Sequence, residues 1–418
     1  MTTNPTGRKF DSKTGPGRDG ALRRPRAVRA RNRTFRDGGA CAFRSARWTR
    51  AGTAQRAVPT ALLASPNSVF GCEFRVVAAL LVWLAFAAGT VFAAGARLEV
   101  VTLHSHALKN NPLHDPATRQ VPIFLPAQAT NGARLPVIYY LPGFGGGADG
   151  FIRNANVWKK FTQALADEIT PMVLVVADGK TRWGGSQYLN SSAQGNYADF
   201  VCDDVVAAVE SRHPAPTNGV RRIIAGHSSG GFGALRLGSA RQDLFDAVIA
   251  LSPDSDFPVS HLPLVQIAAV TNEPLADVEK IAAGKLPVPK NGDVTYALAL
   301  SAAYAPRGAR HPGQFEWLYD ANGKFRQDVW RRWLDNDPLT VVEKNPRAFS
   351  PTQMIYLDGA AHDQYSANIG ARAIYEVLKM RPARCAFYEP PGRHSDHVRE
   401  RLQRGLEWVF NRPLITIH

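Results

Sequence analysis

The chain has 418 residues, enough for one large domain or two ordinary ones, and 45% of them are hydrophobic, as in ordinary globular proteins. Its net charge of +15 is concentrated at one end, since residues 1–75 carry 16 of the 50 Lys and Arg and 4 of the 35 Asp and Glu. The remainder is close to neutral, which argues against a nucleic-acid-binding surface outside the N-terminal segment.

Residues 1–75 are predicted to be a disordered basic extension. Up to residue 67 the segment is rich in Arg, Ala, Gly, Thr and Pro and shows neither helical nor strand periodicity. Such a composition buries too little apolar area to offset the loss of chain entropy on folding. Two alternatives remain open: a basic arm that binds nucleic acid, or a stretch that is not translated, with a start near Val69.

Residues 76–96 form an uncharged apolar run that follows Arg75. The run is long enough to span a bilayer, and it ends in Ala94-Gly95-Ala96, a small-x-small pattern that favours signal-peptide cleavage. An uncleaved membrane anchor is the alternative. Both interpretations export the rest of the chain, to the periplasm or the outside, with membrane contact only through 76–96 if it is uncleaved.

Only two of the four cysteines, Cys202 and Cys385, lie in the part of the chain after this run. An exported compartment permits a disulfide between them, but nothing in their spacing requires one. No Cys-x-x-Cys motif or His/Cys cluster indicates a metal, so neither metal nor cofactor is expected.

After residue 97, apolar runs typical of buried strands alternate with segments of helical periodicity. Strands are expected at 97–104, 119–125, 135–141, 171–177, 220–225, 246–251, 353–357 and 384–388. Helices are expected at 151–167, 197–212, 232–241, 365–379 and 395–410. This alternation predicts an α/β fold with a mostly parallel sheet flanked by helices, and a single domain over 97–418.

Residues 254–350 interrupt the alternation. Helical patches at 265–269, 275–283 and 328–334 lie among Pro, Gly and charged residues. We expect a helical insertion that covers the carboxyl edge of the sheet as a lid or substrate wall.

Residues 226–231 read Gly-His-Ser-Ser-Gly-Gly, between an expected strand and an expected helix. The pattern Gly-x-Ser-x-Gly in that context is typical of the nucleophile elbow of α/β-hydrolases. Ser228 would stand at the tip of the turn. Gly226 and Gly230 would be needed because a Cβ atom there would collide with the neighbouring strand or helix.

A serine nucleophile needs a base, and the base needs an orienting carboxylate. In this fold the acid follows the nucleophile in the chain, on a loop at the carboxyl end of a strand. The loop after 353–357 contains Asp358 at the strand end and Asp363 farther out. Asp363 is the better placed to reach a histidine, while Asp358 is the alternative.

The base is expected in the loop after the last strand, which contains His394 and His397. His394 ends the glycine turn and is favoured, whereas His397 falls one turn into the final helix. The oxyanion hole needs two backbone N–H donors. We expect them from Ser229, which follows the nucleophile, and from Phe144 in the glycine-rich loop 143–147. A simple flexible turn is the alternative for its three consecutive glycines, Gly145–Gly147.

From these motifs, residues 97–410 resemble the esterase D-type branch of α/β-hydrolases. That branch includes S-formylglutathione hydrolases, carboxylesterases, feruloyl and enterochelin esterases, and mycolyltransferases. The matching segments are 140–146, 178–197, 226–231, 361–365 and 392–395. The resemblance implies Ser228, Asp363 and His394 as the catalytic triad. The N-terminal extension and the 254–350 insertion depart from the family pattern.

The favoured function is an exported serine esterase that hydrolyses a small-molecule, lipid or sugar ester through an acyl-enzyme. One alternative is an acyltransferase of mycolyltransferase type, which would use the same triad. The other is an inactive, membrane-anchored binding protein. The sequence identifies neither the ester nor the oligomeric state.

Overall fold

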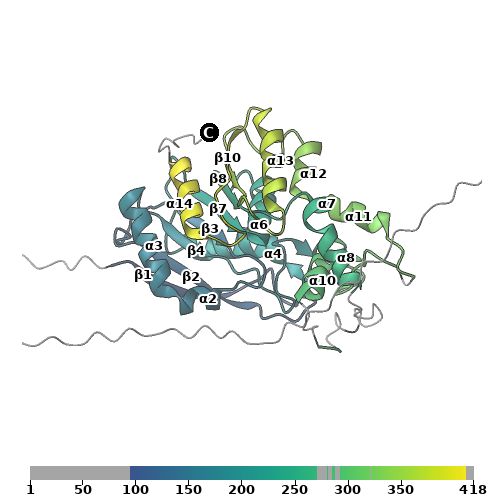
Figure 1. Cartoon of the computed structure of the whole chain (residues 1–418). Helices are drawn as coiled ribbons and strands as arrows, with labels where there is room; N and C mark the ends of the chain where they lie inside the picture. Colours follow the sequence, from purple (N-terminus) through teal and green to yellow (C-terminus); the bar gives the residue numbers. More distant parts are fainter. Residues whose placement is uncertain (1–94, 271–279, 281–284, 288–291, 321, 411–418) are drawn as a thin grey trace, which may run out of the picture. The chain divides into compact units, whose positions relative to one another are not determined.

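The chain folds around an eight-stranded sheet with the order β1-β2-β4-β3-β7-β8-β9-β10 (Figure 1). This computed structural model describes residues 95–270, 280, 285–287, 292–320 and 322–410. The strands are β1 (Arg97–His104), β2 (Thr118–Leu125), β3 (Val137–Leu141), β4 (Val173–Val176), β7 (Arg222–His227), β8 (Ala247–Leu251), β9 (Met354–Asp358) and β10 (Arg384–Tyr388). All eight expected strands are therefore present.

The sheet is antiparallel only at one edge. β2 pairs antiparallel with both β1 and β4, while every pairing from β4 through β3, β7, β8 and β9 to β10 is parallel. The carboxyl ends of six neighbouring strands consequently meet at one edge, where open α/β sheets form their sites. The expected, mostly parallel architecture is confirmed.

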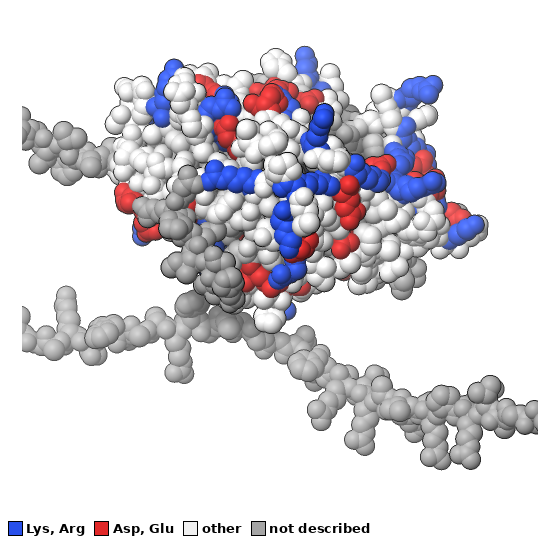
Figure 2. All heavy atoms as spheres, turned by 90° about the horizontal axis from the view of Figure 1, so that it is seen from above, with Lys and Arg blue, Asp and Glu red and all other residues white. Residues whose placement is uncertain are grey.

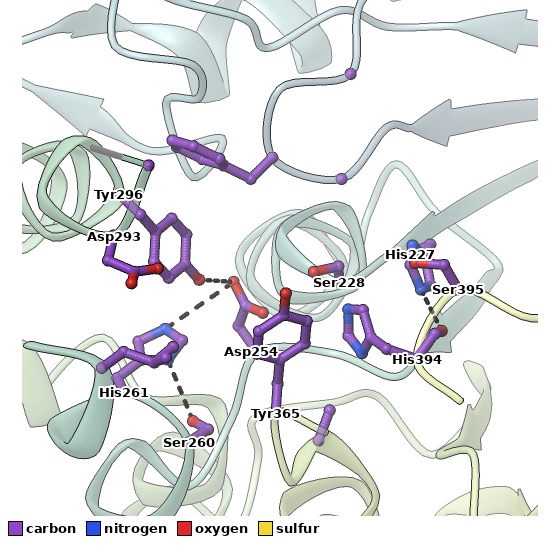
Figure 3. Close-up of a pocket in the computed structure, with 16 residues that line it drawn as sticks. His227, Ser228, Asp254, Ser260, His261, Asp293, Tyr296, Tyr365, His394 and Ser395 are labelled. Atoms are coloured by element: carbon purple, nitrogen blue, oxygen red, sulfur yellow. Dashed lines mark hydrogen bonds and ion pairs between the residues drawn. The ribbon is translucent and has the colours of Figure 1, made fainter. Parts of the chain in front are cut away.

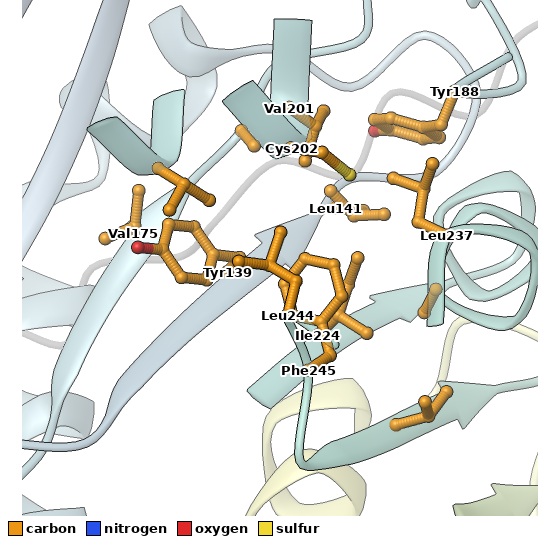
Figure 4. Packing of buried hydrophobic residues seen from close by; sticks show 14 of the residues in the cluster. Tyr139, Leu141, Val175, Tyr188, Val201, Cys202, Ile224, Leu237, Leu244 and Phe245 are labelled. Carbon is orange, nitrogen blue, oxygen red and sulfur yellow. The ribbon is translucent and has the colours of Figure 1, made fainter. Parts of the chain in front are cut away.

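Both faces of the sheet are buried, so its central strands are apolar throughout. Along β3, Tyr139 and Leu141 join one hydrophobic cluster, while Ile138 and Tyr140 join the cluster on the opposite face. Figure 4 shows the first cluster, where Tyr139 and Leu141 lie near Ile224 of β7.

Helices cover each face. One face carries α6 (Ser229–Ala240), α13 (Ala367–Lys379) and the run of α4 (Tyr197–Asp199), a π-helical segment (Phe200–Val205) and α5 (Val206–Glu210). The other carries α2 (Ala148–Arg153), α3 (Ala155–Glu168) and α14 (Val398–Val409). A two-stranded ribbon, β5 (Asn190–Ser191) with β6 (Gly195–Asn196), stands outside the main sheet.

The helices differ in detail from the expected ones. The helix expected at 151–167 begins earlier and is divided at Asn154 into α2 and α3. The helix expected at 197–212 is π-helical over its middle turns. α13 and α14 begin two and three residues later than expected, because Ser366 (φ 59°) and His397 (φ 53°) adopt left-handed backbone just before them.

Between β8 and β9 the described chain is mainly helical, as expected for the 254–350 insertion. Its elements are α7 (Phe257–Ser260), α8 (Leu262–Val270), α10 (Gly292–Tyr304), α11 (Gln327–Leu334) and α12 (Pro338–Lys344). α7, α10 and α11 contribute Phe257, Tyr304 and Trp333 to a hydrophobic cluster of their own, which also takes in Phe232 of α6. The patch expected at 275–283 lies outside the described residues except for Lys280.

The predicted disordered extension 1–75 and nearly all of the predicted signal or anchor segment 76–96 lie outside the described residues. Within the part that is described, no helix is long and apolar enough to cross a bilayer. Cys202 and Cys385 are both free thiols. On the face of the molecule in Figure 2, basic side chains are interspersed with acidic ones.

Candidate active site

Ser228 occupies the sharp turn between β7 and α6, with φ 58° and ψ −125°. A non-glycine residue with positive φ is strained and persists only where its surroundings hold it. Here the Ser228 amide donates a hydrogen bond of 2.9 Å to the Leu251 carbonyl at the end of β8, and the Ser228 carbonyl accepts from Phe232. The turn thus projects the Ser228 side chain beyond the carboxyl edge of the sheet.

The turn depends on the two glycines that flank it. A Cβ atom on Gly226 would lie 2.2 Å from the carbonyl oxygen of Gly230, and one on Gly230 would lie 1.8 Å from the carbonyl oxygen of Leu141. Both distances are far inside van der Waals contact with backbone that cannot move aside. The steric requirement predicted for these two glycines is confirmed.

His394 and Asp363 lie side by side on the loops that follow β10 and β9. Nδ1 of His394 is 2.7 Å from Oδ2 of Asp363, and both side chains are almost wholly buried. Burial alone would raise the pKa of Asp363, but the hydrogen bond and the charge of His394 outweigh it and hold that pKa below its usual range. Asp363 therefore remains an ionised acceptor for the imidazole.

Ser228 and His394 face one cavity of about 560 Å³ (Figure 3). The ring of Tyr365 stands edge-on to His394 at 4.9 Å between ring centroids. Among the described residues, no hydrogen bond joins the Ser228 hydroxyl to His394. Catalytic hydrogen bonds are often long or poorly aligned before substrate binds. The absence of this hydrogen bond therefore does not exclude Ser228 and His394 as a nucleophile and its base.

The two alternative residues lie elsewhere. Asp358 is buried at the end of β9, where it pairs with Arg401 of α14. His397 is exposed at the start of α14. The geometry thus gives Asp363 and His394 the positions that a triad needs, and their catalytic roles stay predictions.

The predicted oxyanion donors, the amides of Phe144 and Ser229, have no acceptor among the described residues. In the glycine-rich loop, the amides of Gly145 and Gly146 donate to Gly184 and to Gly143. The backbone amides of Gly143 and Phe144 donate to no acceptor among the described residues. The loop lies against the nucleophile, since a Cβ on Gly143 would meet the Ser228 Cβ at 3.3 Å.

A family model described as "Putative esterase" matches residues 116–396. The chain belongs to this esterase family. The match spans all six parallel strands of the sheet and the loops that carry Ser228, Asp363 and His394.

Solved structures show the fold of this esterase-family chain. A ferulic acid esterase aligns with a TM-score of 0.50 at 18% identity, over 76% of this chain and 98% of its own. An S-formylglutathione hydrolase from Agrobacterium tumefaciens aligns with a TM-score of 0.50 at 17% identity, over 76% of this chain and 96% of its own. The α/β-hydrolase fold and the resemblance expected from the motifs are confirmed.

One residue of the candidate site that the sequence did not identify is His227, directly before Ser228. Its Nε2 atom lies 2.8 Å from the carbonyl oxygen of His394, so it is the donor. Burial, with a smaller contribution from nearby His394, lowers the pKa of His227 to about 3. His227 is therefore neutral and holds the backbone of the His394 loop. The place of His227 next to Ser228 in the elbow motif could have identified it as a residue of the site.

Residues of the 254–350 segment, expected to form a lid or substrate wall, line the cavity, but the sequence did not identify which of them do so. Asp254 follows β8, His261 lies between α7 and α8, and Tyr296 belongs to α10. Asp254 could have been found from the rule that sites form at the carboxyl ends of parallel strands. His261 and Tyr296 reach the cavity only because of how the inserted helices pack. Local sequence patterns do not predict that packing.

No group of three or more His, Cys, Asp or Glu side chains that could hold a metal ion occurs among the described residues.

Proposed function

We propose that this chain is a serine esterase that hydrolyses carboxylic esters. The observation that carries the proposal is the hydrogen bond between Asp363 and His394, because His394 and Ser228 line one cavity at the carboxyl edge of the sheet. Membership of an esterase family supports the same reaction class. Three groups in the order nucleophile, acid, base are what acyl transfer in this fold requires.

The geometry supports a specific proton path. Because Asp363 accepts a hydrogen bond from Nδ1 of His394, the proton of the neutral imidazole sits on Nδ1 and the lone pair on Nε2. Nε2 would take the proton of Ser228 as its oxygen attacks the ester carbonyl. The amides of Phe144 and Ser229 would stabilise the oxyanion. His394 would then protonate the departing alcohol.

In the second half-reaction, water replaces the alcohol. His394 Nε2 would accept a proton from the water as its oxygen attacks the acyl carbon, and would return that proton to Ser228 as the acid leaves. Every proton is transferred within the site, so the reaction needs no external acid, metal or redox partner.

Two further parts of the proposal rest on other segments. The apolar run 76–96 supports an exported enzyme, with the catalytic body beyond the cytoplasmic membrane. The helices between β8 and β9 would act as the substrate wall, since Asp254, His261 and Tyr296 line the cavity beside the nucleophile.

The test is hydrolysis of p-nitrophenyl esters from acetate to palmitate by the wild type and by Ser228→Ala. We expect turnover in the wild type and a loss of about 10⁶-fold in kcat in the variant. Ser211→Ala, at an exposed serine that does not line the cavity, is the matched control. Labelling by a fluorophosphonate should require Ser228.

Two outcomes would change the assignment. Labelling of Ser228 without hydrolysis of any ester, but with acyl transfer to an added sugar or lipid alcohol, would favour the acyltransferase. Neither hydrolysis nor labelling would contradict the mechanism and leave the inactive binding protein.

A further inference from the structure

Asp254 places a buried carboxylate in the wall of the cavity that holds Ser228 (Figure 3). Only 7% of the residue is exposed. Its Oδ2 atom accepts three hydrogen bonds, from the Ser229 hydroxyl at 2.8 Å, the Tyr296 hydroxyl at 2.9 Å and the Gln187 amide at 3.1 Å. The described residues offer no donor to Oδ1.

His261 adds a buried acceptor without a hydrogen-bond partner beside this carboxylate. The Ser260 hydroxyl lies 2.8 Å from the Ser255 carbonyl oxygen and 3.2 Å from that of Asp256, so we assign its proton to a carbonyl. Nδ1 of His261, 3.2 Å from the same hydroxyl oxygen, is then assigned as the donor in that contact. The Nε2 atom then carries a lone pair. It is buried without a hydrogen-bond partner, 3.9 Å from Oδ2 of Asp254.

His261 does not gain a second proton that its Nε2 atom could donate to Asp254. The side chain is 2% exposed and stacks on Phe257 at 4.3 Å between ring centroids. Burial lowers the pKa of His261, which keeps the ring neutral. The imidazole lone pair thus lies near the Asp254 carboxylate, and the described chain supplies no hydrogen-bond donor to it or to Oδ1 of Asp254.

Among the described residues that line the cavity, the only Asp, Glu, Lys or Arg side chains are the carboxylates of Asp254 and Asp293. His227 is also neutral at ordinary pH. Aromatic rings complete the wall, with Phe144 and Tyr296 edge to face at 4.7 Å. A carboxylate beside aromatic rings in a pocket is suited to an organic cation.

The position of Asp254 bears on catalysis as well. Through the hydroxyl of Ser229 it touches the residue whose amide is the proposed oxyanion donor. A negative charge at that point opposes the build-up of negative charge on the ester oxygen in the transition state. A positive group on the substrate would offset this opposition, whereas a neutral substrate would leave it uncompensated.

We propose that the preferred substrate is an ester that carries a protonated amine, held with an N–H donor on Asp254 Oδ1 and its cationic nitrogen near His261 Nε2. This inference deepens the proposed esterase function and rests on it. Asp254 is then a specificity-determining residue, and the ester is bound with its cationic end on the wall formed by the inserted helices.

The test compares esters of equal shape that differ only in charge. On the alcohol side, 2-(dimethylamino)ethyl acetate is matched by 3-methylbutyl acetate. On the acyl side, p-nitrophenyl 6-(dimethylamino)hexanoate is matched by p-nitrophenyl 7-methyloctanoate. Near pH 7 the wild type should favour the amine of at least one pair by about tenfold or more in kcat/KM, as expected of a charge-assisted hydrogen bond.

Asp254→Asn is the informative variant, because its carbonyl oxygen can still accept from Ser229, Tyr296 and Gln187. Its NH₂ group would replace Oδ1 and repel the ammonium. The ratio between the two esters of the responding pair should fall to within about threefold of unity. Asp149→Asn removes the same charge from an exposed site outside the cavity and should keep the wild-type ratio.

A second measurement uses the wild type alone, in case Asp254→Asn does not fold. 2-(Dimethylamino)ethanol should slow fluorophosphonate labelling of Ser228 at concentrations where 3-methylbutan-1-ol does not. No preference for either amine, or a preference that survives in Asp254→Asn, would overturn the proposal while neutral-ester hydrolysis leaves the esterase function intact. No hydrolysis and no labelling would instead overturn both.

Discussion

Arg401 and Asp358 form an ion pair sealed beneath the loop that carries His394. The side chains are 3% and 0% exposed, and the guanidinium Nη2 lies 2.6 Å from Oδ1 of Asp358. A different nitrogen of the same guanidinium donates to the carbonyl oxygen of His394 at 3.0 Å. That oxygen also accepts from His227, so two donors from different elements fix the backbone of the proposed base.

Arg401→Met should destabilise the protein by about 3–5 kcal/mol, because it leaves Asp358 as a buried charge without its partner. The free energy of unfolding in urea, compared with that of the wild type, measures the change. The double variant Arg401→Met with Asp358→Leu should recover much of the loss, since no lone charge remains. A single variant within 1 kcal/mol of the wild type would show that the pair contributes little.

Asp363→Asn should lower kcat for p-nitrophenyl esters by about 10⁴-fold while the protein stays folded. The asparagine can present its amide to Nδ1 of His394, which favours the imidazole tautomer that is not a base toward Ser228. Steady-state kinetics measure the effect, and circular dichroism checks the fold. Asp149→Asn is a control of equal charge. Retention of more than a tenth of wild-type kcat would remove Asp363 from the proposed triad.

The strands along the chain and the edge of the sheet that carries the candidate site could be predicted from sequence for physical reasons. Strands buried on both faces read as continuous apolar runs, and chain order then assigns each loop to one edge of the sheet. Ser228 is marked further by its flanking glycines, which the backbone contacts of the turn require. Asp363 was favoured over Asp358 because it lies farther along the loop after the strand and can reach a histidine on a neighbouring loop.

The function of Asp358 could not be predicted, because its partner Arg401 is 43 residues away in the chain. The same limit applies to the wall of the cavity. The contacts of Asp254 with Gln187 and Tyr296 join segments 67 and 42 residues distant. Polar contacts of this kind are set by how the inserted helices pack, and packing leaves little periodic trace in the sequence.

His227 makes the stability of the protein sensitive to acid. Above pH 6.5 the ring is neutral in both the folded and the unfolded chain. As the pH falls below 6.5, the unfolded chain takes up a proton, while the folded chain does not until about pH 3. The stability that is complete above pH 6.5 is therefore lost progressively between these two values, by about 2 kcal/mol at pH 5.

The variant His227→Gln separates this effect from other groups. Glutamine can still donate to the His394 carbonyl but does not titrate. Urea unfolding at pH 7.5 and pH 5 should show a smaller loss of stability on acidification in the variant than in the wild type. The lowered pKa of His261 acts in the same direction in both proteins and cancels in the comparison. Equal losses would mean that His227 is accessible to protons in the folded state.

Gly230→Ala should abolish the folded site, because the new Cβ would sit 1.8 Å from the Leu141 carbonyl oxygen and 2.8 Å from that of Pro142. Relief requires α6 to move away from β3, which would also displace Ser228 at the start of that helix. Gly150→Ala is the matched control, since its Cβ would lie 3.9 Å from the nearest atom, in the flexible Arg153 side chain. There the substitution should stabilise α2 by about 0.5–1 kcal/mol. Thermal unfolding and fluorophosphonate labelling of the two variants measure the contrast, and labelling of Gly230→Ala at the wild-type rate would show that the elbow tolerates a side chain at this position.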